Sequence, residues 1–158
     1  MNPSEKVITL LKSIEKKALK PYLCPAGVPT ISYGVTYYED GRPVKLTDPT
    51  ISEARCEQLF MNTIKKYVNC VNEVIRKPMT QQQFDAFFLM CYNCGTHAFS
   101  RPAKVALYFN AGDMAEVKEW WPESFVTSKN TGSLKVTGLV NRRKCEWDIF
   151  ENGIYKKW

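Results

Sequence analysis

The chain has 158 residues, of which 44% are hydrophobic and 13% aromatic, and a formal net charge of +6. This composition excludes a disordered chain, and the length fits one domain or two small lobes that share a helix. The positive charge indicates an anionic polymer or surface as a partner. Lys and Arg are spread from Lys6 to Lys157 without a block of five like charges, so we expect no nucleic-acid binding.

The cysteines and the N-terminus exclude several other classes. Most of the six cysteines fall among apolar neighbours in helix-like stretches and are expected to be free buried thiols. Cys91 and Cys94 form a C-x-x-C pair, but no second pair follows and His97 is the only histidine, so we expect no metal site and no cofactor. The apolar run from Val7 to Leu11 is too short for a signal peptide or a membrane span. We therefore expect synthesis in the cytoplasm and no stable membrane insertion.

The first element in the chain is a predicted helix from Ser4, its N-cap, to about Ala18. Its apolar residues recur at helical spacing, and Glu15 lies beside that apolar face near the end of the helix. A carboxyl at such a boundary is partly removed from water, which suits a general acid.

A small sheet is predicted next. Pro and Gly residues break residues 21–29 into a rigid loop that holds Cys24, and the alternation from Thr30 to Tyr37 predicts a strand. Asp40-Gly41 predicts a hairpin turn, and Pro43 indicates an edge strand or its end. Residues 21–47 should therefore form a three-stranded sheet.

The rest of the chain is predicted to be helical. The longest helical pattern, residues 51–76, has Ser52 as its N-cap and ends before Pro78. A capping box at Thr80 opens the next helix, which ends at Gly95. Later helices are expected from Ser100 to about Gly112, from Asp113 to the Trp120-Trp121 pair, and from Gly138 to Glu151, with a polar loop at 123–136.

Three residues stand at a recognisable spacing: Glu15, then Cys24 nine positions later, then Thr30 six positions after that, in the strand Thr30-Ile31-Ser32-Tyr33-Gly34. This pattern resembles the phage-type lysozymes, glycoside hydrolase family 24. Four later segments stand in the order that this family has, so the resemblance spans nearly the whole chain: Gln83–Ala86, Tyr92–Gly95, Phe109–Asp113 and Gly138–Arg143.

The resemblance implies a mostly helical α+β, two-lobed, lysozyme-like fold in a single domain covering residues 1–158. The N-terminal lobe, at about 1–51, would hold the small antiparallel sheet. A connecting helix would follow at about 52–77, and a helical C-terminal lobe at about 78–158. The cleft between the lobes would hold the active site.

The resemblance also implies roles for the site residues. Glu15 would be the general acid, and Cys24 and Thr30 would act on the opposite face of the sugar, with Thr30 hydrogen-bonding the attacking water. Cys24 could ionise and serve as base, could form a covalent intermediate, or could only pack while Thr30 holds the water.

Four more residues are predicted to contact substrate or the acid. Ser32 stands where the family usually has Gly and would narrow the cleft slightly. Asn93 is a candidate for binding a sugar N-acetyl or hydroxyl group, or else a cap for the helix that ends at Gly95. Arg142 or Arg143 would reach Glu15, because the family places a basic residue there; alternatively, each is a surface arginine.

The implied function is that of a phage endolysin, a muramidase that cuts the β-1,4 bond between N-acetylmuramic acid and N-acetylglucosamine in peptidoglycan. It would be a monomer made in the host cytoplasm, reaching the periplasm through a membrane lesion made by a separate holin. Two alternatives stay open: a lytic transglycosylase, and a lysozyme-like wall-binding module without turnover. Thr30, as a residue that positions water, argues against the transglycosylase.

Overall fold

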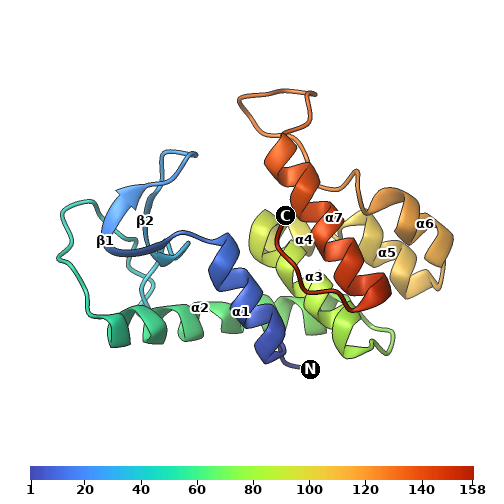
Figure 1. Cartoon of the computed structure of the whole chain (residues 1–158), viewed down its shortest axis with the longest axis horizontal. Helices are drawn as coiled ribbons and strands as arrows, with labels where there is room; N and C mark the ends of the chain where they lie inside the picture. The colour runs from blue at the N-terminus through green and yellow to red at the C-terminus, as the bar shows by residue number, and fades with distance from the viewer. The chain divides into compact units, whose positions relative to one another are not determined.

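The computed structural model describes all of residues 1–158 and is α+β with mostly helical content (Figure 1). The chain forms two compact units. We call Leu11–Lys66 the hairpin unit, and Met1–Leu10 together with Tyr67–Trp158 the helical unit. Two helices cross a boundary between these units: α1 (Glu5–Ile14) and α2 (Glu53–Val74). The first turns of α1 belong to the helical unit and its end belongs to the hairpin unit.

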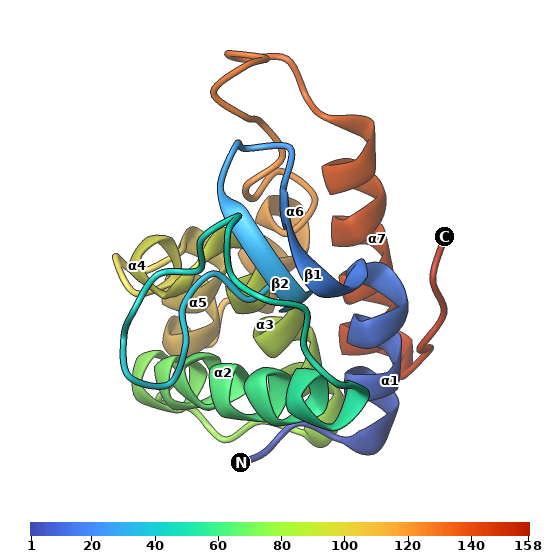
Figure 2. The same ribbon diagram turned by 90° about the vertical axis from the view of Figure 1, so that its left-hand side faces the viewer.

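The sheet of the hairpin unit has two strands, β1 (Lys17–Leu23) and β2 (Pro29–Tyr33), which pair antiparallel (Figure 2). The expected continuation of the first helix to Ala18 and the expected loop from Pro21 are therefore both wrong. Pro21 is accommodated where the register is irregular, between Ala18 and Tyr22. A proline, which has no N–H to donate, is tolerated in a strand at such an interruption of the ladder.

The expected third strand is also absent, since only single bridges, Ile31 to Val35 and Tyr37 to Pro43, extend the pairing. The predicted Asp40-Gly41 turn is confirmed: the Gly41 N–H donates to the Tyr38 carbonyl at 3.0 Å, and Gly41 has φ +84°. A small apolar core lies beneath the hairpin and the loop that follows it; it contains Ile31, Val35, Val44 and Leu59.

The long helix predicted from residue 51 is confirmed as α2, with 22 residues. Ser52 caps it, because its hydroxyl accepts from the Arg55 N–H at 3.1 Å. At about 1.5 Å per residue this helix is about 33 Å long. It contributes its first turns to the hairpin unit and, from Tyr67 on, its last turns to the helical unit.

The helical unit is built on α3 (Gln81–Cys94) and α7 (Thr137–Asn152), which pack against one another (Figure 1). The predicted capping box at Thr80 and the end of α3 at Gly95 are confirmed. Along the chain, three short helices lie between α3 and α7: α4 (Thr96–Phe99), α5 (Lys104–Ala111) and α6 (Met114–Trp120). Ser100 ends α4 and does not cap the next helix, which starts after Ala103, so that expectation is wrong.

The core of the helical unit is aromatic. Phe87 on α3 is fully buried and its ring lies 5.1 to 6.1 Å, centroid to centroid, from four other rings. These belong to Phe99, Phe109, Trp121 and Phe150. Such edge-to-face and tilted pairs stabilise a core beyond the area that they bury.

Both ends of the chain are attached to α3 through Asp85, which is fully buried. Its carboxylate accepts from the backbone N–H and hydroxyl of Ser4, at 3.0 and 2.5 Å, and from the Tyr155 hydroxyl at 2.6 Å. Ser4 in turn caps α1, as expected from the sequence, by accepting from the Val7 N–H at 3.2 Å.

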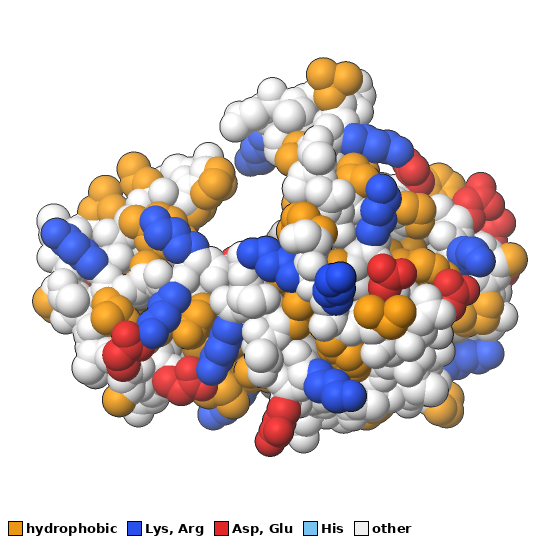
Figure 3. Space-filling model, viewed as in Figure 1, with side chains coloured by type: hydrophobic (Ala, Val, Ile, Leu, Met, Phe, Trp, Pro, Cys, Tyr) orange, Lys and Arg blue, Asp and Glu red, His pale blue; other side chains and the backbone are white.

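Lys and Arg side chains are distributed over both units on the face shown in Figure 3 and do not gather in one patch. None of the helices combines the length and the apolar character that crossing a bilayer would require.

Candidate functional site

The predicted acid, Glu15, is the first residue after α1. Its backbone N–H still donates to the Leu11 carbonyl at 2.9 Å, so the last helical turn holds its backbone in place. Its side chain is half-buried. The sequence therefore located Glu15 correctly at a helix end, although the helix stops sooner than predicted.

The structure brings Cys24 and Thr30 together. Cys24 begins the turn between the strands: its N–H donates to the Val28 carbonyl at 3.1 Å, and Gly27, at φ +76°, donates back to the Cys24 carbonyl at 2.8 Å. Thr30 is only 2% exposed, and its hydroxyl donates to the Val28 carbonyl at 2.8 Å. That hydroxyl also lies within hydrogen-bonding reach of the Cys24 sulfur.

The turn makes Cys24 a better acid than an ordinary thiol. Burial is the largest single influence and raises its pKa, but hydrogen bonds from the Val28 and Ala26 N–H groups and from the Thr30 hydroxyl together outweigh it. The net result is a pKa below the usual value of a thiol. Hydrogen bonds to the charged form favour that form, so the site stabilises a thiolate.

Tyr22 is a residue of this site that sequence reasoning missed. It pairs with Thr30 across the hairpin, and the Lys16 ammonium lies 4.2 Å from its ring centroid. Its pKa is raised first by burial and then by the negative charges of Glu15 and Cys24. The Tyr22 hydroxyl therefore lies within electrostatic range of both predicted catalytic groups. Its position two residues before Cys24 would have indicated a shared strand face, had β1 been predicted.

Ser32 is fully buried, and its hydroxyl donates to the Cys56 carbonyl at 2.8 Å, which ties β2 to the start of α2. Its φ is +57°, a left-handed conformation that glycine adopts more readily than serine. This backbone explains why a glycine suits the position. A contact of Ser32 with substrate stays a prediction, with its hydroxyl committed to Cys56 in this structure.

The other predicted binding residues lie in the helical unit, where Asn93 and the two arginines meet Glu146. Arg143 is fully buried; its Nη2 donates to Asn93 Oδ1 at 2.8 Å and to Glu146 Oε1 at 2.7 Å. Arg142, 5% exposed, donates to the Leu89 carbonyl at 3.4 Å and places its Nε 3.6 Å from Glu146 Oε1. Neither is the surface arginine that was the alternative, and their approach to Glu15 stays a prediction.

Burial raises the pKa of the Glu146 carboxyl, and the two guanidinium groups oppose that effect. Sequence reasoning missed Glu146, although its spacing of three from Arg143 on one helix is a signal for an ion pair.

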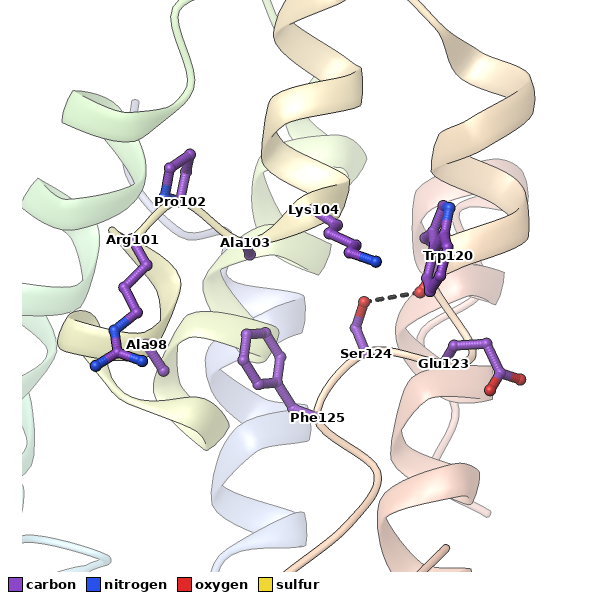
Figure 4. Close-up of a pocket in the computed structure, with 9 residues that line it drawn as sticks. All are labelled: Ala98, Arg101, Pro102, Ala103, Lys104, Trp120, Glu123, Ser124 and Phe125. Carbon is purple, nitrogen blue, oxygen red and sulfur yellow. Dashed lines mark hydrogen bonds between the residues drawn. The ribbon is translucent and has the colours of Figure 1, made fainter. Parts of the chain in front are cut away.

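A pocket of about 380 Å³ lies beside this network in the helical unit (Figure 4). Its lining is mostly apolar and comes from α4, the connection between α4 and α5, the start of α5, the end of α6 and the segment after it. The Lys104 ammonium lies 3.6 Å from the Trp120 ring centroid, and the Ser124 hydroxyl donates to the Trp120 carbonyl at 2.7 Å. The Ser124 carbonyl accepts from Arg143 Nη1 at 3.2 Å, so the network reaches the wall of the pocket.

No group of three or more His, Cys, Asp or Glu side chains is arranged to hold a metal ion. The C-x-x-C pair lies in α3 and at its end: burial is the main cause that raises the pKa of Cys94, to about 12, and Cys91 is fully buried. Cys91 is thus a thiol of the helical core, and Cys94 is a partly buried thiol at the end of α3.

The hairpin unit of this α+β protein thus holds a half-buried carboxyl at a helix end and a turn that brings a thiol and a hydroxyl close together. Residues 12–146 match the phage lysozyme family. The chain is 32% identical over 158 residues to the endolysin of Bacillus phage B103, and the matched region covers 97% of this chain and 55% of that protein. The chain belongs to the phage lysozyme family.

Two further similarities cover whole proteins. The chain is 31% identical over 156 residues to the endolysin of Acyrthosiphon pisum secondary endosymbiont phage 1, covering 96% of this chain and 99% of that one. The solved structure of the endolysin from Escherichia coli O157:H7 phage FAHEc1 matches with a TM-score of 0.87 at 32% identity, over 99% and 98% of the two chains. The chain thus spans about half of the Bacillus phage relative but nearly all of these two.

Proposed function

We propose that this chain is a phage endolysin that hydrolyses the β-1,4 bond between N-acetylmuramic acid and N-acetylglucosamine in peptidoglycan. The observation that supports this most directly is the hairpin turn, where the Thr30 hydroxyl meets the Cys24 sulfur in the unit that also carries Glu15. Glycoside hydrolysis needs an acid for the leaving oxygen and a second group that acts on the opposite face of the sugar.

In the proposed reaction Glu15 gives its proton to the glycosidic oxygen as the bond to the anomeric carbon breaks. A water molecule attacks that carbon, and its proton passes to the Cys24 thiolate. Thr30, whose hydroxyl lies beside the Cys24 sulfur, would be the hydrogen-bond partner of that water. The lowered pKa of Cys24 supports the base role over the packing role. A covalent thioglycosyl step is the less economical route, because Thr30 would then have no water to hold in the first step.

The test is the loss of turbidity of purified peptidoglycan suspensions with wild type, Glu15→Gln and Thr30→Val. We expect Glu15→Gln to lower the rate about 100- to 10,000-fold, the usual contribution of a general acid. Glu5→Gln is the matched control, since Glu5 is an exposed carboxyl on the adjoining helix α1. Full activity in Glu15→Gln would refute the acid assignment.

Mass spectrometry of the products separates hydrolysis from the alternatives. Reducing ends with one added water support the hydrolase, whereas anhydro ends would identify a lytic transglycosylase. Retention on peptidoglycan by the wild type without any product would identify a wall-binding module.

We further propose that the protein works as a monomer, without a cofactor, on peptidoglycan in the periplasm, which it enters through a lesion made by a separate holin. The net charge of +6 would draw it to an anionic wall. Expression in the cytoplasm of a Gram-negative host should leave cells intact until the inner membrane is permeabilised. Lysis without that treatment would show that release has another route.

A further inference from the structure

The side chain of Asn93 is held by a buried ion pair. Asn93 lies in the last turn of α3 and is half-buried, and its Oδ1 accepts from Arg143 Nη2 at 2.8 Å. The same Nη2 donates to Glu146 Oε1 at 2.7 Å, and Nη1 donates to the Ser124 carbonyl at 3.2 Å. Three directions thus fix the planar guanidinium, and through it the plane of the Asn93 amide.

This contact determines which way the amide faces. The oxygen and nitrogen of an asparagine side chain are distinguished only by their hydrogen bonds. Because a guanidinium has donors and no acceptor, the atom of Asn93 that meets Arg143 has to be the oxygen. Its Nδ2 group is therefore turned away from Arg143, where it can donate to a ligand.

The buried ion pair of Arg143 and Glu146 costs free energy if its only role is to stabilise the fold. Arg143 and Glu146 are both fully buried, and Arg143 Nε has no hydrogen-bond partner. Taking two charges out of water is expensive, and apolar residues of similar volume often stabilise a core equally well or better. In some proteins a buried ion pair fixes one conformation, and here the group that the pair fixes is the half-buried Asn93.

We propose that Arg143 and Glu146 are positioning residues that hold the Asn93 amide with Nδ2 outward, as a donor to the carbonyl oxygen of an N-acetyl group on the glycan. A carbonyl oxygen is an acceptor only, so it is matched by an N–H group and rejected by a carbonyl or carboxylate in the same place. The inference rests on the proposed function, and it assigns the two charged residues a role in substrate affinity rather than in bond cleavage.

The first test measures binding without turnover, in the Glu15→Gln background, with soluble peptidoglycan oligomers. Asn93→Asp keeps the acceptor for Arg143 but replaces the outward donor by an oxygen. We expect Kd to rise about tenfold, the value of one hydrogen bond to substrate. With oligomers whose amino sugars are N-deacetylated, Asn93→Ala should leave Kd unchanged, because the carbonyl oxygen that Asn93 would bind is absent.

The second test shows whether Arg143 acts through Asn93. Arg143→Lys keeps the charge but loses the planar fork, and it should raise Kd about tenfold in the presence of Asn93. In an Asn93→Ala background the same substitution should leave Kd unchanged, because the group that it positions is gone. Glu146→Gln is a milder variant for which the same pattern is expected if Arg143→Lys does not fold.

Asp85→Asn is the matched control, because Asp85 is an equally buried polar residue on the same helix α3. It should lower Tm and leave Kd unchanged, which separates destabilisation from positioning. Lysis by the wild type together with an unchanged Kd in Asn93→Asp, or equal effects of Arg143→Lys in both backgrounds, would overturn the inference and leave the proposed function standing. A wild type that neither lyses nor binds peptidoglycan would overturn both.

Discussion

The hairpin unit and the helical unit differ in the size of their buried cores and in the predicted site residues that they carry. The helical unit buries a continuous aromatic cluster around Phe87 and also holds the buried, hydrogen-bonded side chains of Asp85 and Arg143. The hairpin unit has a smaller set of buried apolar residues, which includes the cluster of Ile31, Val35, Val44 and Leu59, and a sheet of two short strands. Yet the predicted acid, thiol and hydroxyl all lie in the hairpin unit. If Glu15, Cys24 and Thr30 carry out the proposed reaction, stability and chemistry belong largely to different parts of one small chain.

The largest effect on stability is expected from removing the centre of the aromatic cluster. Phe87→Ala should destabilise the protein by about 3–5 kcal/mol, because it leaves a cavity that four rings cannot fill. Urea denaturation followed by circular dichroism measures the change. Leu107→Ala is the control, since Leu107 is 51% exposed, and it should cost less than about 0.5 kcal/mol. A small effect of Phe87→Ala would mean that the helical unit does not carry the stability.

The complementary change in the hairpin unit should affect rate and not stability. If the Cys24 thiolate is the base, kcat/KM rises with pH through the pKa of that thiol, which the hydrogen bonds of the turn hold below the usual value of a thiol. Cys24→Ser should remove this limb of the pH profile and lower the rate at neutral pH about 100-fold.

Cys24→Asp sharpens the assignment, because a carboxylate ionises at about pH 4 and should move the limb to acidic pH. Both variants should keep the Tm of the wild type, since Cys24 lies in a partly exposed turn. Nearly full activity in Cys24→Ser would show that Thr30 holds the water and that the thiol only packs.

A pH dependence of stability should belong to the helical unit. Burial, followed by the hydrogen bond to Asp85, raises the pKa of Tyr155 above its usual value of about 10. The folded state therefore holds this proton more tightly than the unfolded state. The resulting stabilisation is complete below about pH 10 and is lost as the pH rises through the higher folded-state value.

Tyr155→Phe should cost about 1 kcal/mol at pH 7, and it should remove this alkaline loss. Urea denaturation between pH 7 and pH 11 measures both effects. Tyr37→Phe, at a residue that is 53% exposed, is the control and should change neither. An unchanged alkaline loss in Tyr155→Phe would place its origin elsewhere.

The smallest effect is expected at Ser32. Ser32→Gly relieves the left-handed backbone but gives up the hydrogen bond to the Cys56 carbonyl, so the two changes should cancel to within about 1 kcal/mol. Ser32→Ala loses the same bond and keeps the unfavourable φ, so it should be the less stable of the two variants. Equal stability of the two variants would show that the backbone at Ser32 is not strained.

Local signals predicted most elements well. The cap at Ser52, the capping box at Thr80 and the end of α3 at Gly95 each depend on one or two residues and their immediate neighbours, and each is confirmed. The errors lie where a partner far along the chain overrides local preference. Lys17 and Ala18 continue a helical pattern, but they belong to β1 and pair with Tyr33 and Ser32 of β2. Pro21 fits into β1 only because the register is irregular there.

The sequence by itself determined the family, the positions of Glu15, Cys24 and Thr30, and the order of the main helices, because spacing, caps and periodicity are properties of a single stretch of chain. The tertiary structure was needed to show that the Thr30 hydroxyl lies beside the Cys24 sulfur, that Tyr22 lies within range of two acidic groups, and that Arg143 joins Glu146 to Asn93. These hydrogen bonds and pKa values depend on distances between side chains, which the turn, the helix ends and the packing of the folded chain set and which spacing in the sequence does not.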